Sequence, residues 1–172
     1  DGVVEGIIQK CNSPDKVMLL PNGVDTEFFQ PLSSIDERSR PKQFLYAGTH
    51  GYAHGVDVIL YAAHTLKQRR DIEFLLVGDG AEKPRLCKLA DELQLPNLKF
   101  LEPVPLTQMP SLLNESYVAL VTVTGGAFFS GTRSAKLFPA MAMGRAILHS
   151  GYGEGAKLVQ SAQCGIVTPP GD

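Results

Sequence analysis

The sequence has no marked excess of charge of either sign. Its 172 residues carry 16 Lys and Arg against 18 Asp and Glu, a formal net charge of −2. Proteins that bind nucleic acid normally gather a basic excess on one face, whereas the cations here are scattered among the acids. The charge balance therefore disfavours nucleic acid as a partner.

Long apolar runs and paired cysteines are also lacking. The longest apolar runs, such as Tyr117–Val123, fall far short of the ~20 residues that cross a bilayer, and no basic-then-apolar leader opens the chain. Cys11, Cys87 and Cys164 are odd in number, widely spaced and without a CxxC pair, so neither a disulfide framework nor a zinc site is indicated. We therefore expect a cytoplasmic protein in which no segment spans a membrane.

Several motifs of metal and dinucleotide chemistry are absent. His50 and His54 stand four residues apart without a third ligand or an HExxH pattern, so we expect no metal site. Neither Gly48 to Gly51 nor Gly78 to Gly80 completes the GxGxxG spacing, and the first of these loops has no P-loop lysine. A nicotinamide or flavin enzyme is therefore a weak alternative, and no Ser-His-Asp or paired-carboxylate set can be assembled.

What the sequence does contain is a regular alternation of strand and helix patterns, in a chain long enough for one hydrophobic core. Short apolar runs predict strands at Lys16–Leu20, Phe44–Ala47, Phe74–Val77, Leu98–Leu101, Tyr117–Val123, Ala146–His149 and Gly165–Val167. Between them, apolar stripes and capping signals predict helices near 59–66, 86–93, 110–113, 136–143 and 156–161. This alternation predicts an α/β fold, a Rossmann-like parallel sheet with helices on both faces.

Turn and linker signals divide the chain into three parts. Residues 1–30 form an amino-terminal segment that includes the first strand, and residues 31–42 are polar, contain two prolines and are typical of a surface linker. Residues 43–172 form the α/β domain. Because Asp172 is well placed to cap a helix that the sequence does not supply, we expect this domain to be truncated at its carboxyl-terminal end.

The loop that follows the strand Phe44–Ala47 is the best candidate for a phosphate site. In a parallel sheet such a loop meets the amino end of the next helix, where free N–H groups and the helix dipole favour anions. The loop combines glycines with a hydroxyl and two imidazoles: Gly48, Thr49, His50, Gly51, His54 and Gly55. If a diphosphate binds there, either histidine can donate to it. The alternative is a glycine-rich turn of purely geometric origin.

A second loop, Ser130–Lys136, also enters a helix and carries two cations and three hydroxyls. Arg133 and Lys136 would favour an anion there. Alternatively this segment is solvated, with Ser134 as a helix cap. Asp79, between two glycines, is similarly ambiguous, because Asp is a common turn former that bonds its own backbone.

Five strings occur in a familiar order along the chain: Pro21–Asp25, Tyr46–Gly51, Leu76–Gly80, Lys136–Arg145 and Gly165–Asp172. Together they resemble the carboxyl-terminal domain of retaining GT-B glycosyltransferases of family 4, closest to the branch that assembles bacterial capsule, colanic-acid-like or O-antigen sugars. The resemblance implies one half of a GT-B fold. It also implies that the amino-terminal domain, which holds the acceptor, is absent from this chain.

The resemblance implies transfer of a sugar, with retained anomeric configuration, from a UDP- or GDP-sugar to a saccharide or lipid-linked acceptor. No metal and no further cofactor are implied. The partners would be the donor, the acceptor and the protein's own amino-terminal domain, with peripheral contact at the inner face of the membrane if the acceptor is lipid-linked. We expect the isolated domain to be inactive.

Carried over by position, Gly48–Gly51 would face the diphosphate, Gly78–Gly80 would line the donor cleft and the Pro103–Val104 backbone would lie near the base. Ser134 and Lys136 would sit beside phosphate or sugar. The predicted donor-binding set is Gly48, Thr49, His50, Gly51, His54, Asp79, Gly80, Pro103, Val104, Arg133, Ser134, Lys136 and Pro139. No residue is assigned to catalysis.

The sequence also departs from the family pattern. Many relatives carry Arg and Lys where this chain has Thr49 and His54, and Pro139 occupies the place of a glutamate that binds the donor ribose. Gly131 and Ala146 replace another acid and a usual proline. Two functions stay open: the donor half of a working glycosyltransferase, and a catalytically inactive nucleotide-sugar-binding module. A sugar-nucleotide epimerase is a distant alternative, because it would need cleft acids that the sequence does not identify.

Overall fold

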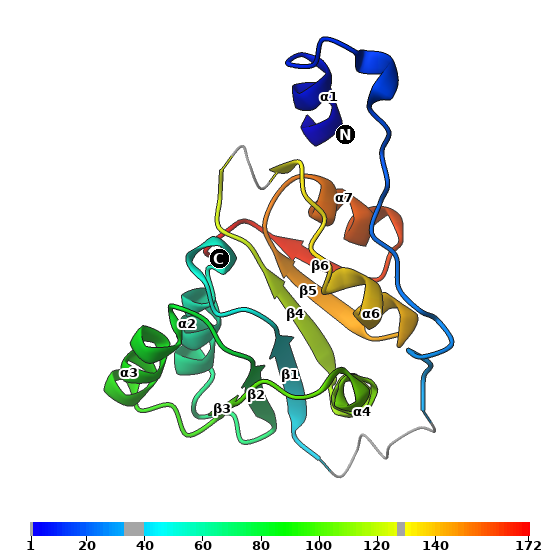
Figure 1. The fold of residues 1–172 in the computed structure, drawn as a ribbon. Helices are drawn as coiled ribbons and strands as arrows, with labels where there is room; N and C mark the ends of the chain where they lie inside the picture. Colours follow the sequence, from blue (N-terminus) through cyan, green and yellow to red (C-terminus); the bar gives the residue numbers. More distant parts are fainter. Residues whose placement is uncertain (1, 33–39, 127–129) are drawn as a thin grey trace.

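A computed structural model describes residues 2–32, 40–126 and 130–172 of the chain. A six-stranded parallel sheet forms its centre, in the order β3-β2-β1-β4-β5-β6 (Figure 1). The strands are β1 (Lys42–Ala47), β2 (Ile72–Val77), β3 (Leu98–Leu101), β4 (Val118–Thr122), β5 (Ala146–Ser150) and β6 (Gly165–Thr168). The predicted α/β, Rossmann-like fold is therefore confirmed.

Helices cover both faces of the sheet because successive strand residues point to opposite sides and most of them are apolar. On one face, α2 (Asp57–Thr65) and α3 (Lys83–Leu93) pack on a core that contains Tyr46, Phe74 and Leu76. On the other face lie α4 (Met109–Glu115), α6 (Leu137–Ala142) and α7 (Glu154–Ser161). That second core contains Leu45 and Val77, neighbours in sequence of residues in the first.

The strand order places the two candidate loops side by side. From β1 the chain moves outward through β2 to β3, and it then returns to the other side of β1 for β4, β5 and β6. The order therefore reverses between β1 and β4. In open parallel sheets, ligands bind beyond the carboxyl ends of the strands at such a switch point.

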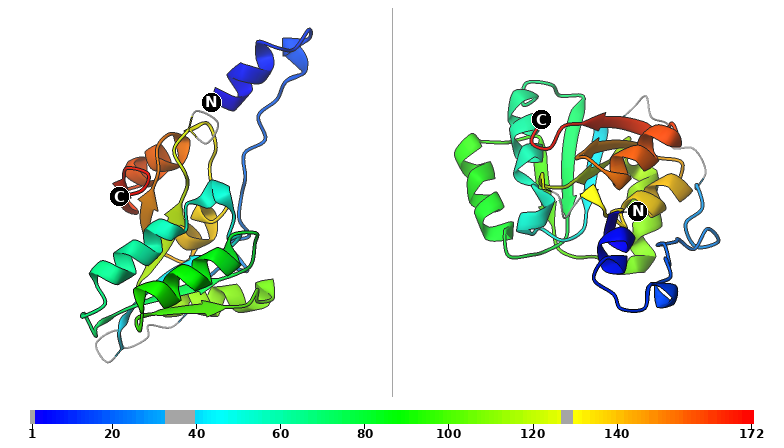
Figure 2. Two further views of the ribbon diagram at one scale, coloured as in Figure 1. Left: turned by 90° about the vertical axis from the view of Figure 1, so that its left-hand side faces the viewer. Right: turned by 90° about the horizontal axis from the view of Figure 1, so that it is seen from above.

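The amino-terminal segment differs from the prediction of a first strand at Lys16–Leu20. The chain begins with α1 (Gly2–Ile8) and the 3₁₀ turn η1 (Pro14–Lys16), and the residues that follow pair with no described strand. Figure 1 and the left-hand view of Figure 2 show this segment standing away from the sheet, and Met18 and Leu20 are 83% and 85% exposed. A short apolar run predicts a strand only where a neighbouring strand can pair with it.

The segment returns to the domain before the linker. Asp25 accepts the backbone N–H groups of Glu27 and Phe28, at 2.9 and 3.0 Å, and this turn directs Phe29 into the core beside Leu113. The amino-terminal segment therefore contributes a core residue to the domain. Most of the predicted linker, 33–39, lies outside the described residues.

Candidate functional site

A pocket of about 510 Å³ opens at the carboxyl ends of β1, β2 and β4. This volume suits a ligand of drug or nucleotide size. Most of its lining is apolar: Phe29, Leu45, Val77, Val104, Leu106, Met109, Leu113, Ala119, Leu120, Val121 and Ala135. The majority of these residues belong to the core on the face covered by α4 and α6. The 3₁₀ turn η3 (Leu106–Gln108) closes one side. The switch point of the sheet thus carries a largely apolar cavity.

Glycines allow the loops after β1 and β2 to pack backbone against backbone at this pocket. Gly78 has a φ of +136°, and a Cβ there would lie 2.1 Å from the Gly48 carbonyl oxygen. A Cβ on Gly80, whose φ is +156°, would lie 2.4 Å from the carbonyl oxygen of His50. Side chains do not fit at such distances, and the backbone angles favour glycine. The two loops therefore form one continuous wall.

Lys136 brings a cation to this wall. A Cβ on Gly48 would lie 2.2 Å from the Lys136 Cε, so the lysine side chain lies directly against the glycine. Its ammonium stands 5.3 Å from the centroid of the Tyr46 ring, within range of a cation–π contact. Burial lowers the pKa of Lys136. Among the described residues no carboxylate contacts this ammonium, which therefore remains available to an anion in the pocket.

Tyr46 supports both the lysine and the glycine loop. Its hydroxyl donates to the Thr49 carbonyl oxygen at 2.7 Å, and its ring is fully buried. Burial raises the pKa of this phenol far above its ordinary value, so it stays neutral. The ring under Lys136 is thus an uncharged, fixed platform.

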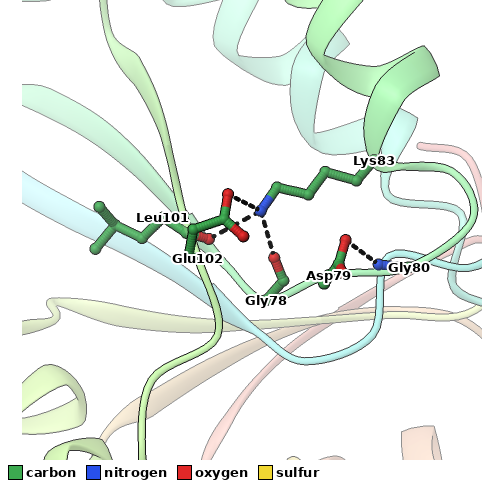
Figure 3. A network of polar contacts seen from close by, with 6 residues as sticks. All are labelled: Gly78, Asp79, Gly80, Lys83, Leu101 and Glu102. Atoms are coloured by element: carbon green, nitrogen blue, oxygen red, sulfur yellow. Dashed lines mark hydrogen bonds and ion pairs between the residues drawn. The ribbon is translucent and has the colours of Figure 1, made fainter.

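Asp79 and Lys83 organise the next part of the wall (Figure 3). The Asp79 carboxylate accepts the Gly80 N–H at 2.8 Å, which is the self-bonding turn expected of this residue type. The Lys83 ammonium donates to the Gly78 carbonyl at 2.9 Å and the Glu102 carboxylate at 2.8 Å, with a longer contact of 3.5 Å to Leu101. Lys83 thereby ties the loop after β2 to the end of β3.

His50 and His54 lie outside the pocket. The His50 side chain is fully buried, packed against the rings of Tyr46 and Phe100 at centroid distances of 5.7 and 6.0 Å, and neither ring nitrogen has a partner among the described atoms. Burial lowers the pKa of both imidazoles, Lys136 lowers it further for both, and Lys83 also lowers that of His50. Both imidazoles are therefore neutral at pH 7.

The second predicted loop contributes one of its two cations. Lys136 lies in the pocket, whereas Arg133 is exposed and pairs with Glu154 at 3.1 Å. The side chain of Ser134 forms no cap; the helix α6 begins after Lys136, and the Ser134 carbonyl accepts the Leu137 N–H at 3.1 Å. The alternative in which Ser134 caps the helix is therefore wrong, whereas the helix itself lies within one residue of its predicted bounds.

The pocket brings together about half of the predicted donor-binding set. Those that line it are Gly48, Thr49, Asp79, Pro103, Val104, Lys136 and Pro139. Those that do not are His50, Gly51, His54, Gly80, Arg133 and Ser134. Sequence reasoning missed Phe29, Leu106 and Met109, which carry no motif, and it missed Lys83, whose only signal is its position early in α3.

The described residues form neither a metal site nor a membrane-spanning helix. Within 2–32, 40–126 and 130–172, no cluster of three or more His, Cys, Asp or Glu is placed to hold a metal ion. No helix in the same ranges is long and apolar enough to cross a membrane.

Comparison with known proteins points to one enzyme class. WbjE of Pseudomonas aeruginosa, a probable glycosyltransferase, is 28% identical over 174 residues, which cover 95% of this chain and 43% of WbjE. WcaI of Escherichia coli K12, a putative colanic acid biosynthesis glycosyl transferase, is 29% identical over 129 residues, which cover 70% of this chain and 31% of WcaI. The chain thus spans less than half the length of these relatives.

The fold is shared with solved GT-B glycosyltransferases. The crystal structure of HepE from Anabaena in complex with UDP and glucose matches with a TM-score of 0.80 and 18% identity, covering 98% of this chain and 47% of HepE. The sequence profile described as "Glycosyl transferases group 1" matches residues 41–172, most of the chain. The chain therefore belongs to the family of glycosyl transferases group 1.

Proposed function

We propose that this chain is the donor-binding domain of a family 4 glycosyltransferase and holds a UDP- or GDP-sugar in the pocket at the switch point. Lys136 is the observation that carries the proposal. It is a half-buried cation in the pocket, and no described carboxylate contacts it. A buried ammonium without an acid is costly unless a ligand supplies the negative charge. A diphosphate supplies that charge.

The rest of the pocket fits the other parts of a sugar nucleotide. The Pro103 and Val104 side of the lining, with Leu106 and Met109, offers an apolar surface for a base. Gly48 lets a diphosphate approach the backbone beside Lys136. As the nucleotide diphosphate departs, negative charge grows on its oxygens, and a fixed ammonium stabilises that charge.

The relatives support the same proposal. The HepE structure contains UDP and glucose, and WbjE and WcaI are described as glycosyltransferases. We propose that the acceptor is a saccharide or a lipid-linked saccharide held by a further, amino-terminal domain of a longer protein. Transfer would retain the anomeric configuration, in the cytoplasm or at the inner face of the membrane.

Thermal unfolding in the presence of UDP, GDP and ADP tests donor binding. A ligand that binds the folded state alone at 100 times its Kd adds about 2.7 kcal/mol of stability, which raises the Tm of a domain of this size by about 5–11 °C. We expect one of the three nucleotides to do so, and the shift to fall to about half or less in Lys136→Met at the same ligand concentration. No shift with any of them would overturn the proposal.

One observation favours a second function, a module that binds nucleotide sugar without catalysis. Pro139 lines the pocket and has no group that can accept a hydrogen bond from a donor hydroxyl. A longer form of the protein, incubated with labelled donor and acceptor, separates the two functions. A product with the donor's anomeric configuration, seen by NMR, supports the transferase; binding without product supports the inactive module.

A further inference from the structure

The pocket contains few groups that could recognise the hydroxyls of a ligand. Among the described residues that line it, Asp79 and Lys136 are the only ones with charged side chains. Lys136 can only donate hydrogen bonds, and Pro139 can neither donate nor accept through its side chain. An ionised carboxylate, in contrast, accepts from several donors. Asp79 is thus the one charged acceptor for hydroxyl groups in the described lining.

The Asp79 carboxylate has one oxygen committed and one to spare. Oδ1 accepts the Gly80 N–H at 2.8 Å. The described residues supply neither a cation nor a second donor to this carboxylate. An ionised carboxylate offers about four lone-pair sites on its two oxygens. The turn hydrogen bond therefore orients the carboxylate without using its capacity, and Oδ2 can take hydrogen bonds from a ligand.

Lys83 fixes the turn that carries this carboxylate. Its side chain is 12% exposed. It donates to the carbonyl of Gly78, which precedes Asp79, and to the carboxylate of Glu102 just after β3 (Figure 3). On the other side, Gly78 is pressed against the Gly48 carbonyl. The peptide before Asp79 is thus held from two directions. A backbone held in this way loses little freedom when a ligand binds.

The order of the loops along the sheet matches the order of groups in a nucleoside diphosphate. Adjacent strands place Pro103–Val104 after β3, Asp79 after β2 and Gly48 after β1, with Lys136 against Gly48. A diphosphate is repelled by Asp79 and attracted by Lys136. The base therefore falls at the β3 side, the diphosphate at the β1 side, and the ribose between them at Asp79.

We propose that Asp79 recognises the ribose diol of the donor by accepting hydrogen bonds from its hydroxyls, and that Lys83 is a positioning residue for Asp79. The inference rests on the proposed function, because it assumes that a nucleoside diphosphate occupies the pocket. It makes Asp79 a determinant of specificity for ribonucleotides. A deoxyribonucleotide would leave the carboxylate without one of these donors.

The test compares the affinities of UDP, 2′-deoxy-UDP and 3′-deoxy-UDP, or the corresponding GDP or ADP set, for the 172-residue chain. A hydrogen bond between a hydroxyl and a carboxylate changes affinity by roughly tenfold or more. We expect the wild type to prefer the ribonucleotide by about that factor. In Asp79→Ala the preference should fall to about onefold, with deoxynucleotide affinity nearly unchanged. Asp79→Asn, which keeps an acceptor for Gly80, should lie between the two.

Lys83→Met should reduce the same preference, and Lys83→Arg should restore part of it by donating to the same carbonyls. Lys88→Met is the matched control, because Lys88 lies on the same helix, is exposed and pairs with Glu92, away from the pocket. A general loss of stability would weaken all nucleotides equally and leave the preference intact, so the ratio of affinities separates positioning from folding.

The outcomes distinguish the inference from the function on which it rests. If UDP, GDP and ADP all fail to bind the wild type, the proposed function fails and the inference fails with it. If a nucleotide binds, and Asp79→Ala keeps the wild-type preference or the wild type has none, the inference alone is overturned. If the sugar hydroxyls are the true partners, Asp79→Ala weakens the nucleotide sugar but not the free diphosphate, which also overturns it.

Discussion

The two faces of the sheet end differently at its carboxyl edge. On the face covered by α2 and α3, His50 is fully buried between Tyr46 and Phe100. On the face covered by α4 and α6 lies the pocket, with Lys136 at its rim. The same glycine loop supplies both arrangements, since His50 faces one side while Gly48 and Thr49 line the other.

The two faces differ in the surroundings of their buried polar groups. Burial lowers the pKa of His50 and thereby favours its neutral imidazole, which costs less to desolvate than the charged form. Burial lowers the pKa of Lys136 from a much higher ordinary value, and its ammonium lies beside a space that can admit an anion. A polar group that the fold encloses affects the free energy of unfolding. A polar group that borders a pocket affects the affinity for a ligand. The predictions below test this division.

Gly78→Ala should have the largest effect on stability, because it disrupts the packing between the loops after β1 and β2. The new Cβ would lie 2.1 Å from the Gly48 carbonyl oxygen, a backbone atom that cannot rotate away. Collision and backbone strain together should lower the free energy of unfolding by more than about 3 kcal/mol, a Tm loss of about 6–12 °C or more. Differential scanning calorimetry measures it.

Gly126→Ala is the control for strain alone. Gly126 has a φ of +145°, close to that of Gly78, but its Cβ would meet nothing within 4 Å. Its substitution should cost about 1–2 kcal/mol. Equal losses in the two variants would mean that the contact between the two loops contributes nothing to stability.

Lys136→Met should weaken nucleotide binding by about 10- to 100-fold, the usual effect of losing a hydrogen bond to a charged group. The ligand-free protein should be as stable as the wild type or more so, because a half-buried charge without an acid is removed. Isothermal titration calorimetry and thermal unfolding give the two quantities.

Arg133→Met is the matched substitution in the same loop. Arg133 is exposed and pairs with Glu154, and an exposed ion pair is worth about 0–1 kcal/mol. Nucleotide affinity should change by less than about threefold. If Arg133→Met weakens binding as much as Lys136→Met, the division between the two cations is wrong.

Pro139→Glu sharpens the proposed role of Asp79. Position 139 lies in the first turn of α6, where a carboxylate suits the helix dipole, and its side chain lines the same pocket. In the wild type a second acid should change ribonucleotide preference by less than about threefold, whereas in Asp79→Ala it should restore about tenfold. Pro139→Met, which removes the ring without adding an acceptor, should restore nothing. A large gain in the wild type would instead indicate a degenerate native site.

The sheet could be predicted from the sequence, and the direction of side chains at its edge could not. Apolar residues on both faces and the glycines that follow predict strands such as Phe74–Val77. The run Lys16–Leu20 has the same local pattern but pairs with no described strand. Whether a pairing strand exists cannot be predicted from the local pattern.

The candidate site could be predicted in part, where its residues have a local signal in the sequence. Glycine loops and Lys136 carry signals in the sequence, because their chemistry is local. Which of Thr49 and His50 enters the pocket depends on how the loop packs against Gly80 and Phe100, and Phe29 arrives from a segment outside the repeating units. These are tertiary facts, and no spacing in the sequence encodes them.

His50→Leu should have the smallest effect, and one visible only through pH. The folded state keeps the His50 imidazole neutral with a pKa below its ordinary value, whereas the unfolded chain takes up a proton near pH 6.5. The unfolded state thus binds more protons as the pH falls, so His50 contributes stability above about pH 6.5 that is lost toward acid. His54 and His149, whose pKa values burial also lowers, act in the same direction.

Replacing His50 with an apolar side chain removes one of these titrations and two buried nitrogens that have no described partner. At pH 8 the free energy of unfolding of His50→Leu should equal or exceed that of the wild type, and between pH 8 and pH 5 it should fall less. Nucleotide affinity at pH 8 should be unchanged, because His50 does not line the pocket. A loss of affinity at pH 8 with unchanged stability would move His50 from the face covered by α2 and α3 to the binding site.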